Sequence, residues 1–303
     1  MTHKLISVLI PNFNRNALLE QTLNSVISQS IGYECLDIIV VDDYSQIEDP
    51  LDIISKFSLF GVKLIRNEVN LGQMRNLNKC LSFAKCKYVH ILHSDDFIEK
   101  SFYAEIIEQF KLHPSAGAVF TRNFFVNNNG FITGVSTLFT ENSGEIENWL
   151  NNLYCEQLIQ APSVVVKKEI YDKVGKFRED LRTCEDWEMW VRISEVSQVI
   201  FHNKVLANYR STSTSNSSTT TFDGTYVHDW QKLQKETFLK HKDPKLLLRS
   251  KILFGNFIIN NIPNFKLPTV LYWRFFFYLP TMKMKIKYLL KFINLKLTKN
   301  ATN

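Results

Sequence analysis

The sequence predicts an α/β protein with a mostly parallel central sheet flanked by helices, followed by a helical, basic C-terminal arm. Short apolar runs alternate with segments of helical spacing over the first 125 residues. Strands that are apolar on both faces and alternate with helices are typical of parallel sheets. The arm is predicted from charge. Residues 244–303 contain eleven Lys or Arg and no acid, whereas the preceding 243 residues carry 25 basic and 30 acidic residues.

The expected elements follow one another in strand–helix order. Strands are expected at Leu5–Ile10, Leu36–Val41, Val62–Arg66, Tyr88–Leu92 and Ala118–Asn123, with helices at Ala17–Ser28, Asp52–Phe57, Met74–Ala84 and Ser101–His113. Further along we expect a hairpin turn at Asn127–Gly130, a helix at Glu145–Leu153, strands near Ser163–Lys167 and Val205–Tyr209, and an acidic helix start at Cys184–Trp187. We expect two domains, over residues 1–222 and 223–303.

Composition excludes several classes of protein. The chain has 303 residues, of which 45% are hydrophobic and 22% charged, so it is long and apolar enough for a buried core. Ten Gly and eight Pro exclude collagen-like chains. Five cysteines without a CxxC pair argue against a disulfide framework and a structural zinc site. Together with a start that lacks secretory features, they predict a cytoplasmic, reducing location.

Polar residues follow three of the expected strands at the point where each strand ends. They are Pro11–Arg15, Asp42–Ser45 and His93–Asp96. Ligands of such sheets bind at the carboxyl ends of the strands, so two Asp-Asp pairs there predict a ligand site. A single pair would be equally compatible with a helix cap or an Asx turn. No GxGxxG follows the first strand, which argues against a dinucleotide-dependent oxidoreductase.

The order of motifs over roughly residues 4–215 resembles the family 2 glycosyltransferases, which are inverting enzymes of the GT-A fold that use nucleotide-sugar donors. The resemblance is carried by SVLIPNFNR (7–15), IVVDDYS (39–45), RNEVNLGQMRNLNKCL (66–81), YVHILHSDD (88–96) and CEDWEMWVRI (184–193). It implies transfer from a nucleotide sugar, with UDP-sugars the expected donors, to a glycan or lipid-linked glycan in cell-surface polysaccharide or lipopolysaccharide synthesis. The alternative is a non-catalytic nucleotide-sugar-binding or scaffold protein of the same fold, because His93 stands where the family has Asp.

The resemblance also implies which residues bind the donor nucleotide. They are Pro11, Asn12, Phe13, Arg15, Asp42, Asp43, Asn70, Gly72, Arg75, Ser94 and Asp95. Asp43 would accept a hydrogen bond from the N–H of a uracil-type base. Arg75 would face the diphosphate or the base, or would alternatively form a surface salt bridge. Arg210 is a possible further contact of the diphosphate.

The remaining implied roles concern metal and acceptor. Asp96 is the expected ligand of Mn²⁺ or Mg²⁺, whose preference for carboxylate oxygens fits this position. His93 would either touch the nucleotide or be structural. Asp186 is the expected general base with Glu185 in reserve, and both could also cap a helix. Trp187, on the acceptor side, would stack on a sugar or belong to the core.

The arm lies outside the resemblance. Its apolar runs are interrupted by charges and are too short for a spanning helix. Aromatic and cationic residues mix at 271–278, and Lys283, Lys285, Lys287 and Lys291 would each attract anionic lipid by about 1 kcal/mol. We expect peripheral contact with the inner face of the cell membrane, or alternatively packing on the first domain or a second subunit. Nucleic acid is not expected as a partner. The sequence indicates neither the oligomeric state nor the sugar.

Overall fold

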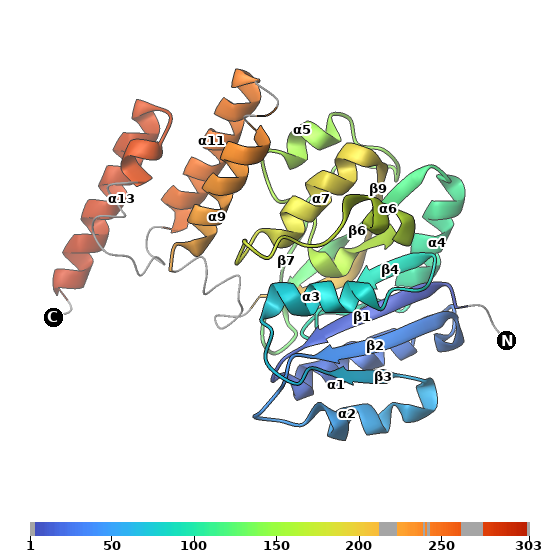
Figure 1. Cartoon of the computed structure of the whole chain (residues 1–303). Helices are drawn as coiled ribbons and strands as arrows, with labels where there is room; N and C mark the ends of the chain where they lie inside the picture. The colour runs from blue at the N-terminus through green and yellow to red at the C-terminus, as the bar shows by residue number, and fades with distance from the viewer. Residues whose placement is uncertain (1–3, 212–222, 239, 241–242, 262–274, 302–303) are drawn as a thin grey trace. The chain divides into compact units, whose positions relative to one another are not determined.

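The computed structural model describes residues 4–211, 223–238, 240, 243–261 and 275–301 (Figure 1). The chain forms two compact units. The first comprises residues 1–147, 159–181 and 185–212, and the second comprises residues 148–158, 182–184 and 213–303. The boundary expected at residue 222 falls in the segment 212–222, outside the described residues.

A nine-stranded sheet organises the first unit, in the order β3-β2-β1-β4-β8-β6-β9-β5 with β7 paired to β6. The strands are β1 (Ile6–Asn12), β2 (Leu36–Asp42), β3 (Lys63–Arg66), β4 (Tyr88–Ile91), β5 (Phe97–Ile98), β6 (Ala116–Val126), β7 (Ile132–Val135), β8 (Val164–Lys167) and β9 (Gln198–Arg210). The half β3-β2-β1-β4 is parallel, as predicted. Beyond it the sheet is mixed, because β8 runs antiparallel to both β4 and β6.

Helices cover both faces of the parallel half, which explains why β1 and β2 are buried almost throughout. The helices of this unit are α1 (Asn16–Ile27), α2 (Pro50–Lys56), α3 (Gln73–Ser82), α4 (Phe102–Leu112), α6 (Lys168–Val174) and α7 (Glu185–Val196). The even-numbered residues of β1 share one core cluster with α1, α2 and α4. The helix α3 contacts β1 and β2 and contributes its own buried residues Met74, Leu77 and Cys80.

The strand register aligns the carboxyl ends of the first three strands. Asn12 of β1 lies opposite Asp42 of β2, and Asp42 lies opposite Arg66 of β3. The predicted hairpin turn after β6 is also present, with Gly130 at φ 81°. The side-chain oxygen of Asn127 accepts from the backbone N–H groups of Asn129 and Phe131, which closes this turn.

The second unit is helical, as predicted for the arm. It contains α5 (Trp149–Leu153), α9 (Thr225–Leu233), the π-helical turn η4 (Gln234–Phe238), α11 (Pro244–Asn261) and α13 (Met282–Ala301). The rings of Trp230 and Phe254 stack at a centroid distance of 3.7 Å in its core. Among the helices that the structure describes, none is long and apolar enough to cross a membrane.

Candidate active site

Asp42 ties the ends of β1 and β2 together from inside the protein. Its side chain is fully buried, and its Oδ1 accepts from Asn12 Nδ2 at 2.9 Å and from Ser45 Oγ at 2.5 Å. Its Oδ2 accepts from the backbone N–H of Ser45 at 2.9 Å. Both carboxylate oxygens are therefore used to shape the turn after β2, which fixes where the following residue, Asp43, lies.

Asp43 anchors the loop that leads into α3. Its Oδ1 accepts from Asn67 Nδ2 and from the backbone N–H of Leu71, each at 2.8 Å, and its Oδ2 accepts from the N–H of Gly72 at 2.9 Å. Gly72 has φ 82°, a left-handed conformation that glycine adopts without strain, and it precedes the first residue of α3. The predicted nucleotide residues Asp43, Asn70 and Gly72 thus lie together, and Asn70 Nδ2 donates to the Asp43 carbonyl.

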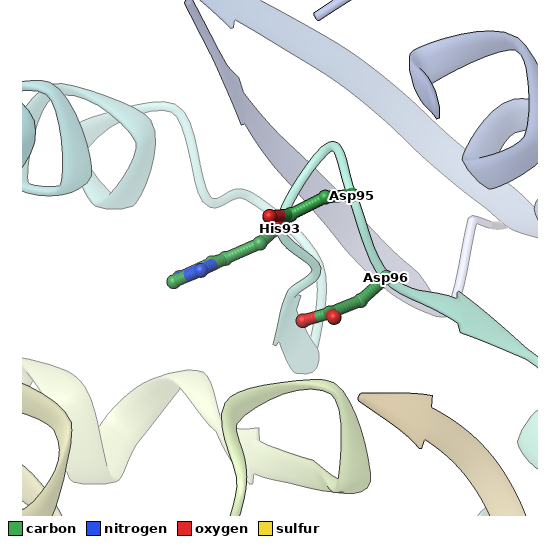
Figure 2. A group of neighbouring side chains, drawn as sticks. All are labelled: His93, Asp95 and Asp96. Carbon is green, nitrogen blue, oxygen red and sulfur yellow. The ribbon is translucent and has the colours of Figure 1, made fainter. Parts of the chain in front are cut away.

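The loop after β4 gathers the predicted metal residues (Figure 2). One ligand atom from each of His93, Asp95 and Asp96 lies within 4.8 Å of the other two. Asp95 also forms an ion pair with Arg15, from the loop that follows β1. The backbone N–H of Arg210 donates to Asp96 Oδ1 at 2.8 Å, which holds the carboxylate in place.

Burial changes the pKa of two of these three residues. Burial raises the pKa of Asp96 to about 7, and the carboxylate of Asp186 contributes to this rise. Burial, assisted by the positive charge of Arg15, lowers the pKa of His93 to about 4. His93 is therefore a neutral imidazole near pH 7, which is the form that binds metals. Two carboxylates and a neutral imidazole match the ligands preferred by Mn²⁺.

The Glu185–Asp186 pair begins α7, after Cys184 at φ 61°. Glu185 is buried, and its Oε1 accepts from Gln73 Nε2 of α3 at 2.9 Å. Asp186 Oδ1 accepts from the N–H of the next residue, Trp187, at 2.9 Å in the first turn of α7. The Asp186 carboxylate also adds, as the smallest of the influences, to the raised pKa of Asp96.

Three other predicted residues have well-defined places. Trp187 is 1% exposed, which favours the core alternative over stacking on a sugar. Arg75 forms an exposed ion pair with Glu179 at 3.1 Å, the second alternative considered for it. Arg210 is buried, and its guanidinium donates to the carbonyls of Asp95, Asn127 and Asn128 and to Gln21 Oε1.

Two exposed aromatic residues follow the carboxyl ends of β1 and β2, which are neighbouring strands of the sheet. Phe13 follows β1 and is 45% exposed, while Tyr44 follows β2 and is 39% exposed. Phe13 is one of the predicted nucleotide-binding residues, whereas no role was predicted for Tyr44 from the sequence. Tyr44 has φ 65°, which is unusual for a bulky residue. An aromatic residue directly after Asp42–Asp43 is the signal that could have identified it.

Curated relatives match this chain over part of their length. A protein of Mycobacterium tuberculosis named as uncharacterized is 28% identical over 219 residues, which are 65% of this chain and 64% of that protein. A poly-β-1,6-N-acetyl-D-glucosamine synthase of Staphylococcus epidermidis is 33% identical over 130 residues, covering 43% of this chain and 31% of the synthase. The chain thus spans less than two thirds of the relatives it matches.

The fold has a close counterpart among solved structures. Residues 1–349 of S. aureus TarS, crystallised with UDP-GlcNAc, superpose with a TM-score of 0.69 at 17% identity, covering 99% of this chain and 92% of that one. At this identity the likeness shows the fold, which is GT-A as the resemblance implied. Residues 7–175, more than half of the chain, match the family described as glycosyl transferase family 2. The chain belongs to that family.

Proposed function

We propose that this protein transfers a sugar from a nucleoside diphosphate sugar to an acceptor hydroxyl with inversion at the anomeric carbon. The acceptor oxygen attacks that carbon and forms the new glycosidic bond. The bond between the carbon and the diphosphate oxygen breaks, and its electron pair leaves with the diphosphate. The acceptor proton passes to a carboxylate, which we assign to Asp186.

The proposal is supported by an electrostatic link between two carboxylate sets from distant parts of the chain. Asp186 at the start of α7 influences the pKa of Asp96 in the loop after β4, 90 residues earlier. Glu185 is buried and already accepts from Gln73. Asp186 is only partly buried and influences the pKa of Asp96, which favours it over Glu185 as the base. A base positioned in this way contributes roughly 10²–10⁴-fold to the rate.

The residues of the β4 loop fit a divalent cation. Asp96, Asp95 and His93 would hold it, because their ligand atoms are gathered and His93 is neutral. When bound, Mn²⁺ or Mg²⁺ would stabilise the negative charge that develops on the departing diphosphate. Arg210 and Arg15 keep the loop in shape through the Asp96 carboxylate and the Asp95 ion pair.

The donor and acceptor are proposed by class. A UDP-sugar donor is supported by the UDP-GlcNAc complex of the structurally similar TarS. Phe13 and Tyr44 offer exposed rings on which a base could stack. Polysaccharide synthesis is supported by the relative named as a poly-β-1,6-N-acetyl-D-glucosamine synthase. A lipid-linked glycan acceptor at the inner face of the membrane is proposed from the basic, acid-free residues 244–303.

The test uses donor hydrolysis, in which water replaces the unidentified acceptor. UDP-, GDP- and dTDP-sugars are incubated with the full chain and Mn²⁺, and proton NMR follows the anomeric signals at early times. An inverting enzyme releases the β-anomer first from an α-linked donor. Release of the α-anomer first would contradict inversion. Binding without metal-dependent turnover of any donor would favour the non-catalytic alternative.

A further inference from the structure

One face of α13 in the second unit is both apolar and exposed. Met282, Ile286, Leu290 and Ile293 recur every three or four residues and are between 46% and 70% exposed. This spacing places them on one side of the helix. Phe277, five residues before the helix, is 72% exposed. We call the four helical residues the α13 stripe.

The other side of α13 packs within its own unit. Met284, Tyr288 and Phe292 are at most 8% exposed. A Cβ atom added to Gly255 of α11 would lie only 2.4 Å from the Cε of Met284, so the glycine permits close packing of the two helices. The α13 stripe is therefore a second apolar face on a helix that is already docked.

Lysines border the α13 stripe along one edge. Lys283, Lys287 and Lys291 form a row one position after Met282, Ile286 and Leu290, as residues four apart do on a helix. By contrast, the ammonium group of Lys285 lies 5.7 Å from the centroid of the Phe276 ring, and we leave it out of the row. No Asp or Glu occurs after Asp243 to neutralise the row from within this part of the chain.

We propose that the α13 stripe and its lysine row lie on an anionic lipid surface. The apolar side chains would enter the boundary between headgroups and acyl chains, and the three ammonium groups would contact lipid phosphates. The positive charge of this face favours an anionic lipid surface over a second copy of the chain. A second copy of the same face would bring three more lysines and no carboxylate, so like charges would oppose a symmetric pairing. The inference gives a structural basis for the membrane location in the proposed function. It rests on that location and not on the proposed transfer reaction.

The test measures partitioning of the full chain to phosphatidylcholine vesicles with and without phosphatidylglycerol. Binding requires the anionic lipid. The variant Lys283→Gln/Lys287→Gln/Lys291→Gln lowers the partition coefficient by about 100-fold, since each cation near an anionic surface contributes about a fivefold factor.

Removing the apolar contacts gives a second, independent measurement. Ile286→Gln/Leu290→Gln lowers partitioning by about 100-fold or more through lost apolar burial, and glutamine keeps the helix propensity high. The matched control is Leu59→Gln/Leu112→Gln, which replaces two exposed leucines of the first unit and leaves partitioning unchanged.

Two outcomes would overturn the proposal. Vesicle binding equal to the unaltered chain in both the lysine and the stripe variants would exclude this face as the lipid contact. A stripe variant that turns an oligomer into a monomer by light scattering, while vesicle binding stays unchanged, would make the face an interface between copies. UDP titration of the same variants separates this question from catalysis, because their UDP affinity stays unchanged.

Discussion

Replacing Asp43 by asparagine tests the anchor of the donor-side loop. The carboxylate is 3% exposed and accepts three N–H groups, from Asn67, Leu71 and Gly72. The asparagine side chain keeps one acceptor oxygen. In place of the other oxygen it has an NH₂ group, which cannot accept a hydrogen bond from a backbone N–H. If the oxygen stays with Asn67 and Leu71, the bond from Gly72 is lost.

The cost can be worked from these contacts. A hydrogen bond to a charged acceptor contributes about 1.5–3 kcal/mol, and an unpaired N–H costs a further ~1–3 kcal/mol when it is fully buried, less for the partly buried Gly72. Asn70 Oδ1 also accepts from the Gly72 N–H at 3.1 Å and would recover part of this loss. We therefore expect Asp43→Asn to lower the free energy of unfolding by about 2–4 kcal/mol, within the stability of a typical domain.

Urea unfolding measures the change, and hydrogen exchange of the peptide containing Leu71 and Gly72 locates it. Exchange of these amides should accelerate in the variant. Glu68→Gln, at a neighbouring exposed carboxylate, is the control and should change stability by less than about 0.5 kcal/mol. If Asp43→Asn also stays within about 0.5 kcal/mol and the peptide exchanges as before, the reasoning about this anchor is refuted.

Three further predictions concern other contacts. Asp96→Asn should remove the enhancement of UDP binding by Mn²⁺, and an unchanged enhancement in calorimetry would disprove its role as ligand. Burial lowers the pKa of His90 from 6.5 to about 3, so the unfolded chain takes up a proton first and stability is lost as the pH falls below 6.5. In His90→Gln the free energy of unfolding should depend less on pH in that range, by up to about 1.4 kcal/mol per pH unit, and an equal slope in urea titrations would contradict this. In Arg210→Lys the single ammonium group cannot donate to all four oxygens that the guanidinium contacts. The substitution should therefore lower the free energy of unfolding by about 2–4 kcal/mol. An unchanged melting temperature would show that these Arg210 hydrogen bonds do not stabilise the fold.

The parallel half of the fold was readable because its strands are apolar on both faces. The expected Leu36–Val41 and Leu5–Ile10 correspond to β2 and β1 within two residues. The mixed half was less readable. The strand expected at Val205 begins at Gln198. β9 pairs with β6 up to His202, and the register then shifts so that Val205 is the next paired residue, which interrupts the alternating pattern. The two-residue strand β5 is too short for any periodic signal.

The strand-end residues of the candidate site were predictable, but their partners were not. Motif spacing identified Asp43, yet the N–H groups that it holds belong to Leu71 and Gly72, 28 and 29 residues later. Backbone donors carry no sequence signature. The place of Trp187 was not predictable either, because an aromatic residue beside an acidic pair is equally compatible with the core and the surface. Its burial in the structure favours the core.

The most direct test of the central claim compares donor hydrolysis with UDP binding in Asp186→Asn. If Asp186 is the base, the dissociation constant of UDP with Mn²⁺ should stay near that of the unaltered chain, while the rate of UDP release from the UDP-sugar falls by roughly 10²-fold or more. Glu185→Gln is the matched control and should lose less, because glutamine keeps an oxygen that can accept from Gln73 and leaves Asp186 in place as the base. Should Asp186→Asn keep more than about a tenth of the rate while Glu185→Gln is inactive, the base is Glu185. If both variants remain active, the pair only caps α7, and the proposed mechanism is wrong.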